Sequence, residues 1–308
     1  MNQKRIEQRL KEINNVIPFR ILLDRHADDK KAIAQYYRLN RLAYRLVNSR
    51  RGFVHMGISR GSTFDEDDFL EHARIISSEY LEKIHNGHIL ELAAGKAATT
   101  KYLAGIYKHA HFTGLDLPHG QLNIHSSQLP NLDLVEGDYH DLSRFAANSF
   151  DIIYIIEALC HAHDKTKVIK EVERILKPNG VFIIFDGYIS QSQAVMSQVE
   201  NLVADLIYSS MMVTKSDHLY SDLRNNLETS GFIMIDEENL SRNVLPSMKR
   251  LESKAAKYFK HPRLARLSNR IVPIEVTGNA VAAYLMPLSV EAHLFQYWLT
   301  VAKKAKAE

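Results

Sequence analysis

The chain has 308 residues, of which 45% are hydrophobic and 24% charged, the proportions of an ordinary globular protein with one large domain and additions to it. Its net charge of +3 gives no support to a nucleic-acid partner, and its single cysteine, Cys160, excludes a disulfide framework and a four-cysteine zinc site. The N-terminal segment has no apolar h-region, so no signal peptide is expected, and the sequence has no run of about 18 apolar residues. We therefore expect a cytoplasmic protein with no integral membrane segment.

Residues 1–80 predict a helical N-terminal cap. Leu10, Ile13 and Ile17 recur at helical spacing, and a second such set begins at Tyr36. The acidic run at residues 65–68 predicts the start of a further helix, where negative charge is favourable. The segment RGFVHMGISRGS between these helices predicts an irregular loop.

From residue 88 onward, short apolar runs alternate with helical patterns. Strands are predicted at residues 88–92, 112–115, 134–136, 150–156 and 181–185, with helices at 97–107 and 165–176. The run at residues 150–156 is apolar along its length, which is typical of a strand buried on both faces. This alternation predicts an α/β fold whose parallel sheet is built with right-handed crossovers.

After Gly187 the pattern becomes mainly helical. Helices are predicted at residues 190–213, 218–230 and 245–259, a sixth strand at GFIMID and a last strand at residues 295–302. We therefore divide the chain into a cap at 1–80 and a main domain at 81–308. The main domain then contains a helical insert at about 190–217 and further helices at about 245–292.

Acidic residues follow four successive predicted strands. Glu91 lies at the end of the first predicted strand, and Asp116 follows the second. Asp138 comes just after the third strand, and Glu157 follows the fourth. The carboxyl ends of parallel strands share one edge of an open sheet, where α/β proteins bind their ligands. The order and spacing predict a site for a nucleoside-like cofactor at that edge.

With these residues in order, the segment at about 85–190 resembles the class I S-adenosylmethionine (AdoMet)-dependent methyltransferases, and the similarity continues more weakly to QYWLTVAKK. FVHMG at residues 53–57 and EALCH at residues 157–161 are similar to motifs of sterol and isoprenoid C-methyltransferases. The resemblance implies a seven-stranded, mostly parallel Rossmann-like sheet with a helical N-terminal cap and a helical insertion. It also implies AdoMet as cofactor and S-adenosylhomocysteine as product.

The resemblance implies a role for each residue of the cofactor site. Glu91 is expected to lie near the cofactor's ammonium, directly or through water. The loop after it carries three alternating glycines in the family, whereas this chain keeps only Gly95 and has Ala93 and Ala97 at the other two positions. Alanine permits a close approach of the cofactor provided that these positions have negative φ. The other expected contacts are Asp116 with the ribose hydroxyls, Leu117 with the adenine or ribose, and Asp138 and Tyr139 with the adenine.

Glu157 and His161 are the expected catalytic residues. Either side chain is a candidate general base for an oxygen or nitrogen acceptor, and Glu157 also suits a carbocation formed on an alkene carbon. Tyr37, His55 and His163 are expected to face the substrate, with Tyr36 and Met56 forming part of a lid. No metal is expected, because His161, His163 and Asp164 lack further ligands in the sequence and methyl transfer from a sulfonium requires none.

Several alternatives remain open from the sequence. A nicotinamide-dependent dehydrogenase would carry G-x-G-x-x-G, which ELAAGKAA lacks. A non-catalytic binding or scaffold protein is consistent with the loss of two loop glycines, although such a protein has no physical need for all of the retained acids. A lipid-like or isoprenoid acceptor is one interpretation of the apolar stripes after residue 190, but the acceptor atom is unresolved. The sequence also leaves open whether the chain forms a homo-oligomer.

Overall fold

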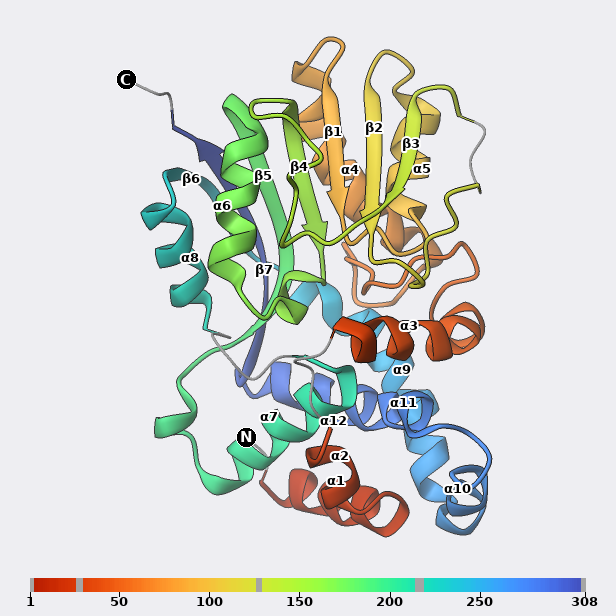
Figure 1. The fold of residues 1–308 in the computed structure, drawn as a ribbon. Coiled ribbons are helices and arrows are strands. Elements are labelled where there is room, and N and C mark those ends of the chain that lie inside the picture. The colour runs from red at the N-terminus through yellow and green to blue at the C-terminus, as the bar shows by residue number, and fades with distance from the viewer. Residues whose placement is uncertain (1–2, 26–29, 126–128, 214–218, 306–308) are drawn as a thin grey trace.

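The computed structural model describes residues 3–25, 30–125, 129–213 and 219–305. Its centre is a seven-stranded sheet of order β3-β2-β1-β4-β5-β7-β6 (Figure 1). The first five strands are parallel, and β7 runs antiparallel to both of its neighbours. This confirms the predicted α/β methyltransferase-type sheet. The strands are β1 (His88–Leu92), β2 (His111–Asp116), β3 (Leu132–Glu136), β4 (Phe150–Ile156), β5 (Leu176–Ile189), β6 (Phe232–Asn239) and β7 (Phe295–Lys304).

Helices cover both faces of the sheet, because successive strand side chains point to opposite sides. On one face, Leu90 of β1 shares a core with Val168 of α6 (Lys165–Ile175) and Leu227 of α8 (Tyr220–Thr229). On the other face, Ile89 shares a core with Ile76 of α4 (Glu71–Glu79) and Leu103 of α5 (Ala98–Ile106). The central strand β4 is buried along its length except for the half-buried Asp151, as its apolar sequence predicts.

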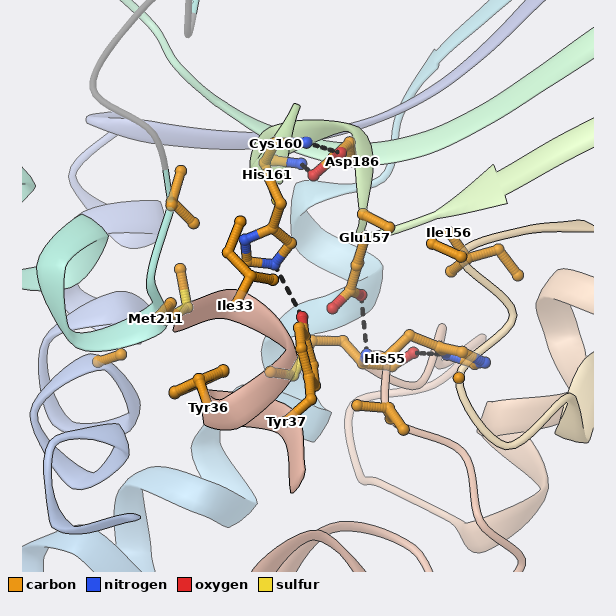
Figure 2. A pocket seen from close by; sticks show the side chains of 18 of the residues that line it. Ile33, Tyr36, Tyr37, His55, Ile156, Glu157, Cys160, His161, Asp186 and Met211 are labelled. Carbon is orange, nitrogen blue, oxygen red and sulfur yellow. Dashed lines mark hydrogen bonds between the residues drawn. The ribbon is translucent and has the colours of Figure 1, made fainter. Parts of the chain in front are cut away.

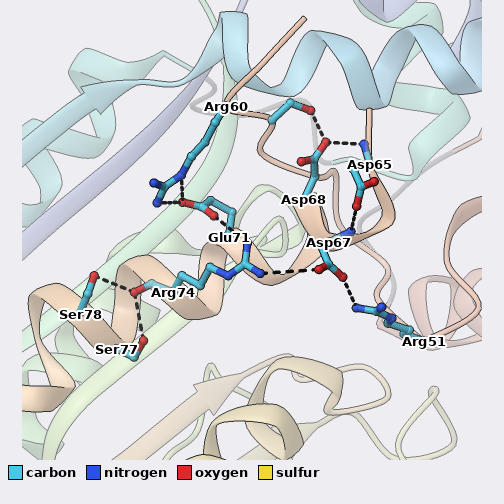
Figure 3. Close-up of polar contacts among 10 residues, drawn as sticks. Arg51, Arg60, Asp65, Asp67, Asp68, Glu71, Arg74, Ser77 and Ser78 are labelled. Atoms are coloured by element: carbon cyan, nitrogen blue, oxygen red, sulfur yellow. Dashed lines mark hydrogen bonds and ion pairs between the residues drawn. The ribbon is translucent and has the colours of Figure 1, made fainter. Parts of the chain in front are cut away.

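A network of polar contacts lies at the start of the helical segment formed by residues 66–79 (Figure 3). The Asp65 carboxylate accepts a hydrogen bond from the Asp67 amide at 2.8 Å, and the Asp68 carboxylate accepts one from the Asp65 amide at 2.9 Å, which forms a capping box. Glu71 is buried and pairs with Arg60 and Arg74. The acidic run therefore starts a 3₁₀ turn, Glu66–Leu70, that leads directly into α4.

Helices from both ends of the chain form one layer at the carboxyl edge of the sheet (Figure 1). Helix α12 packs on α7, α9 and α1, and α11 packs on α3. The predicted division into cap and main domain stays a prediction, and helices of its two parts are in contact. The layer contains α1 (Gln3–Val16), α2 (Phe19–Leu23), α3 (Lys30–Ala43), the π-turn Tyr44–Asn48, α7 (Gln198–Met211), α9 (Ser241–Lys260), α10 (Pro262–Ser268), α11 (Ile274–Thr277) and α12 (Asn279–Glu291).

Two helix boundaries differ from the prediction. The predicted helix at 190–213 begins only at Gln198, because Ser197 and Glu200 form a capping box there. The predicted helix at 218–230 begins at Tyr220, so Leu219 precedes it; residue 218 and the end of the predicted insert, residues 214–217, lie outside the described residues. None of the helices in the described segments is long and apolar enough to span a membrane.

Candidate functional site

A cavity of about 260 Å³ lies between the carboxyl edge of the sheet and the helical layer. Its wall is built from loops that follow β1, β2, β3 and β4, from residues of β5 and β7, and from side chains of α3, α7, α9 and α12. Most residues expected at the site line it, namely Tyr37, His55, Ala93, Gly95, Asp116, Leu117, Tyr139, Glu157 and His161. Glu91, Asp138 and His163 do not line it.

The loop after β1 takes the left-handed conformation at alternate positions. Ala93, Gly95 and Ala97 have φ of 54°, 58° and 54°. The condition that the two alanines have negative φ is therefore not met: they adopt a conformation that costs an L-residue roughly 1–2 kcal/mol. The loop keeps this shape because the Ala94 amide donates to the Leu115 carbonyl at 2.9 Å and the Gly95 amide donates to the Asp116 carboxylate.

Glu91 lies behind this loop and is 5% exposed. Its carboxylate accepts hydrogen bonds from the amide and hydroxyl of Thr100, in the first turn of α5, and from the Tyr154 hydroxyl at 3.3 Å. Burial raises the pKa of Glu91 to about 7 despite these bonds. In this arrangement the Glu91 carboxylate links β1 to α5 through hydrogen bonds beneath the loop. The expected contact of Glu91 with the cofactor's ammonium stays a prediction.

Asp116 lies at the end of β2 with its carboxylate at the cavity. The Leu117 amide donates to it at 2.6 Å in addition to the Gly95 amide, and burial raises its pKa to about 6. A Cβ at Gly120 would approach the carboxylate to 3.2 Å, so glycine keeps this side of the cavity open. Among the described residues, the buried amide of Gln121 finds no hydrogen-bond partner, although Gln121 lines the same wall.

These groups fit the hydroxyls and heteroatoms of a nucleoside. The Asp116 carboxylate accepts hydrogen bonds, the Gln121 side-chain amide can both donate and accept them, and the backbone of the loop after β1 lies beside them. The residues present therefore fit AdoMet. Sequence reasoning missed Gln121 because no pattern separates it from a polar turn residue after Pro118.

Asp138 is engaged away from the main cavity. It forms an ion pair with Lys30 of α3 and accepts hydrogen bonds from the ring and the amide of His140 at 2.7 and 2.9 Å. Burial alone raises its pKa, but the His140 and Lys30 bonds outweigh burial and leave the pKa below its ordinary value. The His163 ring lies 3.9 Å from that of His140, so Asp138 and His163 belong to a small separate cavity of about 20 Å³. Tyr139 lines both cavities and donates to the Ala158 carbonyl at 3.2 Å.

Glu157 projects from the end of β4 into the cavity (Figure 2). Its φ of 48° is left-handed, an uncommon conformation for a residue with a long side chain. One carboxylate oxygen accepts from the Met56 amide at 2.8 Å and from the Tyr297 hydroxyl at 2.9 Å. Burial raises the pKa of Glu157 to about 7, so the carboxyl can exchange a proton near neutral pH.

His161 and Tyr37 form a hydrogen-bonded pair across the cavity, as Figure 2 shows. His161 Nδ1 lies 2.8 Å from the Met212 carbonyl, which can only accept, so this nitrogen carries the proton. Nε2 then accepts from the Tyr37 hydroxyl at 2.7 Å. Because burial lowers the pKa of His161 to about 4, the imidazole is neutral at pH 7.

His55 stands on the opposite wall and is also neutral, since burial lowers its pKa to about 4. Its ring lies 4.2 Å from that of His72, whose Nε2 is 3.0 Å from the Tyr297 hydroxyl. Sequence reasoning missed Tyr297 and His72, because β7 and α4 come close to Glu157 only in the folded chain. It also missed Asp186, which lies near the carboxyl end of β5 and lines the cavity. The pattern of acidic residues at the ends of successive strands could have identified this residue.

Among the described residues, no group of three or more His, Cys, Asp or Glu side chains is arranged to hold a metal ion. Cys160 lines the cavity, and its amide donates to the Asp186 carboxylate at 2.9 Å. Burial raises the pKa of its thiol, so it is protonated at neutral pH.

Comparison with known proteins gives several matches. A family model described as a methyltransferase domain matches residues 90–184. An O-methyltransferase of Penicillium expansum is 28% identical over 68% of this chain and 75% of its own length. The sterol 24-C-methyltransferase of Saccharomyces cerevisiae is 30% identical over 36% of this chain, in a match that spans 29% of that protein.

Among solved structures, a cyclopropane synthase of Mycobacterium tuberculosis matches with a TM-score of 0.70 and 14% identity, over 90% of this chain and 99% of that one. This likeness concerns the fold. The sheet order, a cavity at its carboxyl edge that fits the cofactor, and the sequence matches over β1 to β5 lead to one conclusion. Residues 90–184 form a methyltransferase domain of the class I AdoMet-dependent type, and the protein is an enzyme that methylates a small molecule with AdoMet as donor.

Proposed function

We propose that this enzyme transfers the methyl group of AdoMet to an apolar and uncharged small molecule. The observation that carries the proposal is the composition of the cavity wall that faces away from the cofactor loops. That wall is contributed by the helical layer and β7 and is mostly apolar, although Asn279, Gln296 and several tyrosines also line it. Its residues include Ile33, Met211, Val213, Met248, Leu251, Ala282, Ala283, Met286, Val290 and Phe295.

The two halves of the cavity suit two different ligands. Ala93, Gly95, Asp116, Leu117 and Tyr139, together with Gln121, line the half next to the cofactor loops and would hold AdoMet. The bound cofactor supplies a methyl group on a positively charged sulfur. The methionines of the other half adapt to flexible apolar ligands because their side chains are unbranched and polarizable.

The charges around the cavity favour a neutral acceptor. None of the described residues in its wall is a lysine or an arginine, and its two histidines, His55 and His161, are neutral because burial lowers their pKa values to about 4. The ionisable acids in the wall are Asp116, Glu157 and Asp186. A phosphate or diphosphate group needs cationic donors when it leaves water, so these walls disfavour an isoprenoid diphosphate.

Glu157 is the residue we assign to the chemical step. One carboxylate oxygen is fixed by Met56 and Tyr297, which leaves the other oxygen for the acceptor. With a pKa of about 7, the carboxylate can accept a proton from a hydroxyl or from a carbon next to a developing cation. The Tyr37–His161 pair would orient the acceptor, and the apolar walls exclude water from the reacting atoms. O-methylation and C-methylation both fit this geometry.

A matched pair of ligands tests the proposal. Protein saturated with S-adenosylhomocysteine is titrated with farnesol and with farnesyl diphosphate in a calorimeter, with and without Mg²⁺. We expect farnesol to bind at least about tenfold more tightly, since burying an unpaired charge is costly. Met286→Lys, which adds a cation to the apolar wall, should shift the preference toward the diphosphate. Tighter binding of the diphosphate to the native protein, or no binding of either ligand, would contradict an apolar and neutral acceptor.

A further inference from the structure

The segment between Glu252 and Glu275 carries six basic residues and no acidic residue, although the whole chain has a net charge of only +3. It comprises the end of α9, helix α10 and the turn that follows. All six basic side chains are exposed. Within the described part of the chain none of them forms an ion pair, whereas Lys249, one turn earlier on α9, pairs with Glu291 at 2.7 Å. The basic residues are Lys254, Lys257, Lys260, Arg263, Arg266 and Arg270.

Three large apolar side chains are exposed among these cations. Leu264, Leu267 and Ile271 are 67%, 55% and 81% exposed, at a spacing of three and four residues. The first two lie on neighbouring positions of α10, because residues three apart share a face of a helix. We call these three residues and the six cations the α10 patch. Exposed apolar residues are ordinary when isolated, but three of them among six cations form a contiguous amphipathic surface.

The α10 patch stands on a firmly packed base. Ala265 and Phe259, on the inner side of the same segment, are 3% and 2% exposed, and α10 packs on α1 and α9. The Asn269 amide also donates to the Val16 carbonyl at 3.3 Å. Figure 1 shows α10 at the end of the helical layer that is farthest from the sheet. The apolar side chains are therefore held outward on an ordered element.

We propose that the α10 patch binds the surface of an anionic lipid bilayer. Leucine and isoleucine side chains can enter the boundary between headgroups and acyl chains, while lysine and arginine contact the anionic headgroups. A second copy of this chain is a poor occupant, since two such patches facing each other would bring twelve cations together. A purely acidic partner would use the cations but would leave the three apolar side chains in water.

The helix that ends at the α10 patch also reaches the cavity. Met248 and Leu251 of α9 line the apolar wall, and Lys254, one turn further on, donates to the Val47 carbonyl at 2.6 Å. Val47 and its neighbour Leu46 are 42% and 71% exposed, so a second apolar pair lies near Lys254. Membrane docking would place this helix close to apolar molecules dissolved in the bilayer. The docking proposal stands independently of the identity of the methyl acceptor.

Vesicle flotation tests the proposal with the full chain and without any acceptor. The vesicles are phosphatidylcholine alone, or phosphatidylcholine mixed with phosphatidylglycerol. We expect flotation with the mixed vesicles only, weakened by salt. The triple variant R263Q/R266Q/R270Q should bind roughly a hundredfold more weakly. The matched control K108Q/K167Q/K170Q removes the same charge from exposed positions on the sheet side and should bind as the native protein does.

Two further variants keep the result interpretable. R263K/R266K/R270K retains the charge and should retain binding, so its loss would point to a structural effect of the arginines and overturn the electrostatic role. L264S/L267S/I271S should also lose flotation while its melting temperature stays near that of the native protein. The proposal is overturned if the native protein does not float, if the two charge-removing variants bind equally, or if the serine variant binds like the native protein. In the last case binding to the vesicles would be purely electrostatic, and the three apolar side chains would have no part in it.

Discussion

The hydroxyl of Tyr297 donates a hydrogen bond of 2.9 Å to the Glu157 carboxylate, joining β7 to the end of β4 inside the cavity. The same hydroxyl lies 3.0 Å from Nε2 of His72, which is fully buried and neutral because burial lowers its pKa. Tyr297 therefore stabilises the ionised form of Glu157, in opposition to the burial that raises its pKa to about 7.

Replacing Tyr297 with phenylalanine should raise the pKa of Glu157 above about 7, because the carboxylate loses a donor while its burial is unchanged. Carbon-detected NMR of glutamate carboxyls follows the titration, with Glu157→Gln identifying the signal. The matched control is Tyr188→Phe, since Tyr188 is a buried tyrosine whose hydroxyl has no partner among the described residues. An unchanged pKa in the Tyr297 variant would show that the hydrogen bond is not formed in solution.

The stability that four buried carboxyl groups contribute should fall as pH rises from about 4 to about 7, the interval between their ordinary and their folded-state pKa values. Glu91 and Glu157 have folded-state pKa values of about 7, and Asp116 and Asp186 of about 6, all raised by burial. A carboxyl whose pKa is raised on folding binds more protons in the native state, so its stabilising effect is present below the unfolded pKa and lost as pH passes the folded pKa. For Glu157 alone the difference is up to about 3 kcal/mol.

Chemical denaturation of the native protein and Glu157→Gln at several pH values measures this effect. The variant cannot ionise at residue 157, so its free energy of unfolding should decline less between about pH 4 and pH 7. Parallel declines in the two proteins would mean that Glu157 has an ordinary pKa when folded.

Ala93→Gly and Ala97→Gly should each stabilise the fold by up to about 1 kcal/mol, because glycine adopts positive φ without the steric cost that alanine bears. Thermal unfolding measures the change. Ala98→Gly is the matched control, since Ala98 is the first residue of α5 and glycine weakens a helix. Equal destabilisation by all three substitutions would argue against left-handed backbone at residues 93 and 97.

Asp116→Ala should weaken the binding of S-adenosylhomocysteine by roughly 1–3 kcal/mol, the cost of removing a partner from charged hydrogen bonds. The substitution also removes the acceptor for the Gly95 amide, so the loop after β1 loses one of its restraints. Calorimetric titration gives the affinity, and Asp133→Ala, at a largely exposed carboxylate on β3, should leave it unchanged. An unaltered affinity for Asp116→Ala would remove this residue from the cofactor site.

The sequence predicted the features that depend on local pattern. The apolar runs located the strands within a few residues, except that β5 begins at Leu176 and so extends five residues before its apolar run. The acids at strand ends located Asp116 and Glu157 at one cavity, because parallel strands end at the same edge. The condition of negative φ placed on Ala93 is not met, since residue type alone favours negative φ for alanine and only the surrounding loop forces the opposite sign.

Features that depend on long-range packing could not be predicted. Tyr297 lies 140 residues from Glu157, and the ion pair of Asp138 with Lys30 joins residues 108 apart in the chain. Nothing in the sequence near Asp138 indicates that α3 occupies its carboxylate. Its expected contact with adenine therefore stays a prediction that depends on whether Lys30 releases it.

Transfer of a labelled methyl group tests the central claim most directly. The enzyme is incubated with trideuteromethyl-AdoMet and a lipid mixture separated beforehand into neutral, phosphorylated and cationic fractions, and the products are identified by mass spectrometry. We predict a product heavier by one CD₃ group in the neutral fraction, with turnover reduced in Glu157→Gln by a larger factor than cofactor affinity. Label that appears only in the phosphorylated or cationic fraction, or a Glu157→Gln variant that turns over like the native enzyme, would contradict the account.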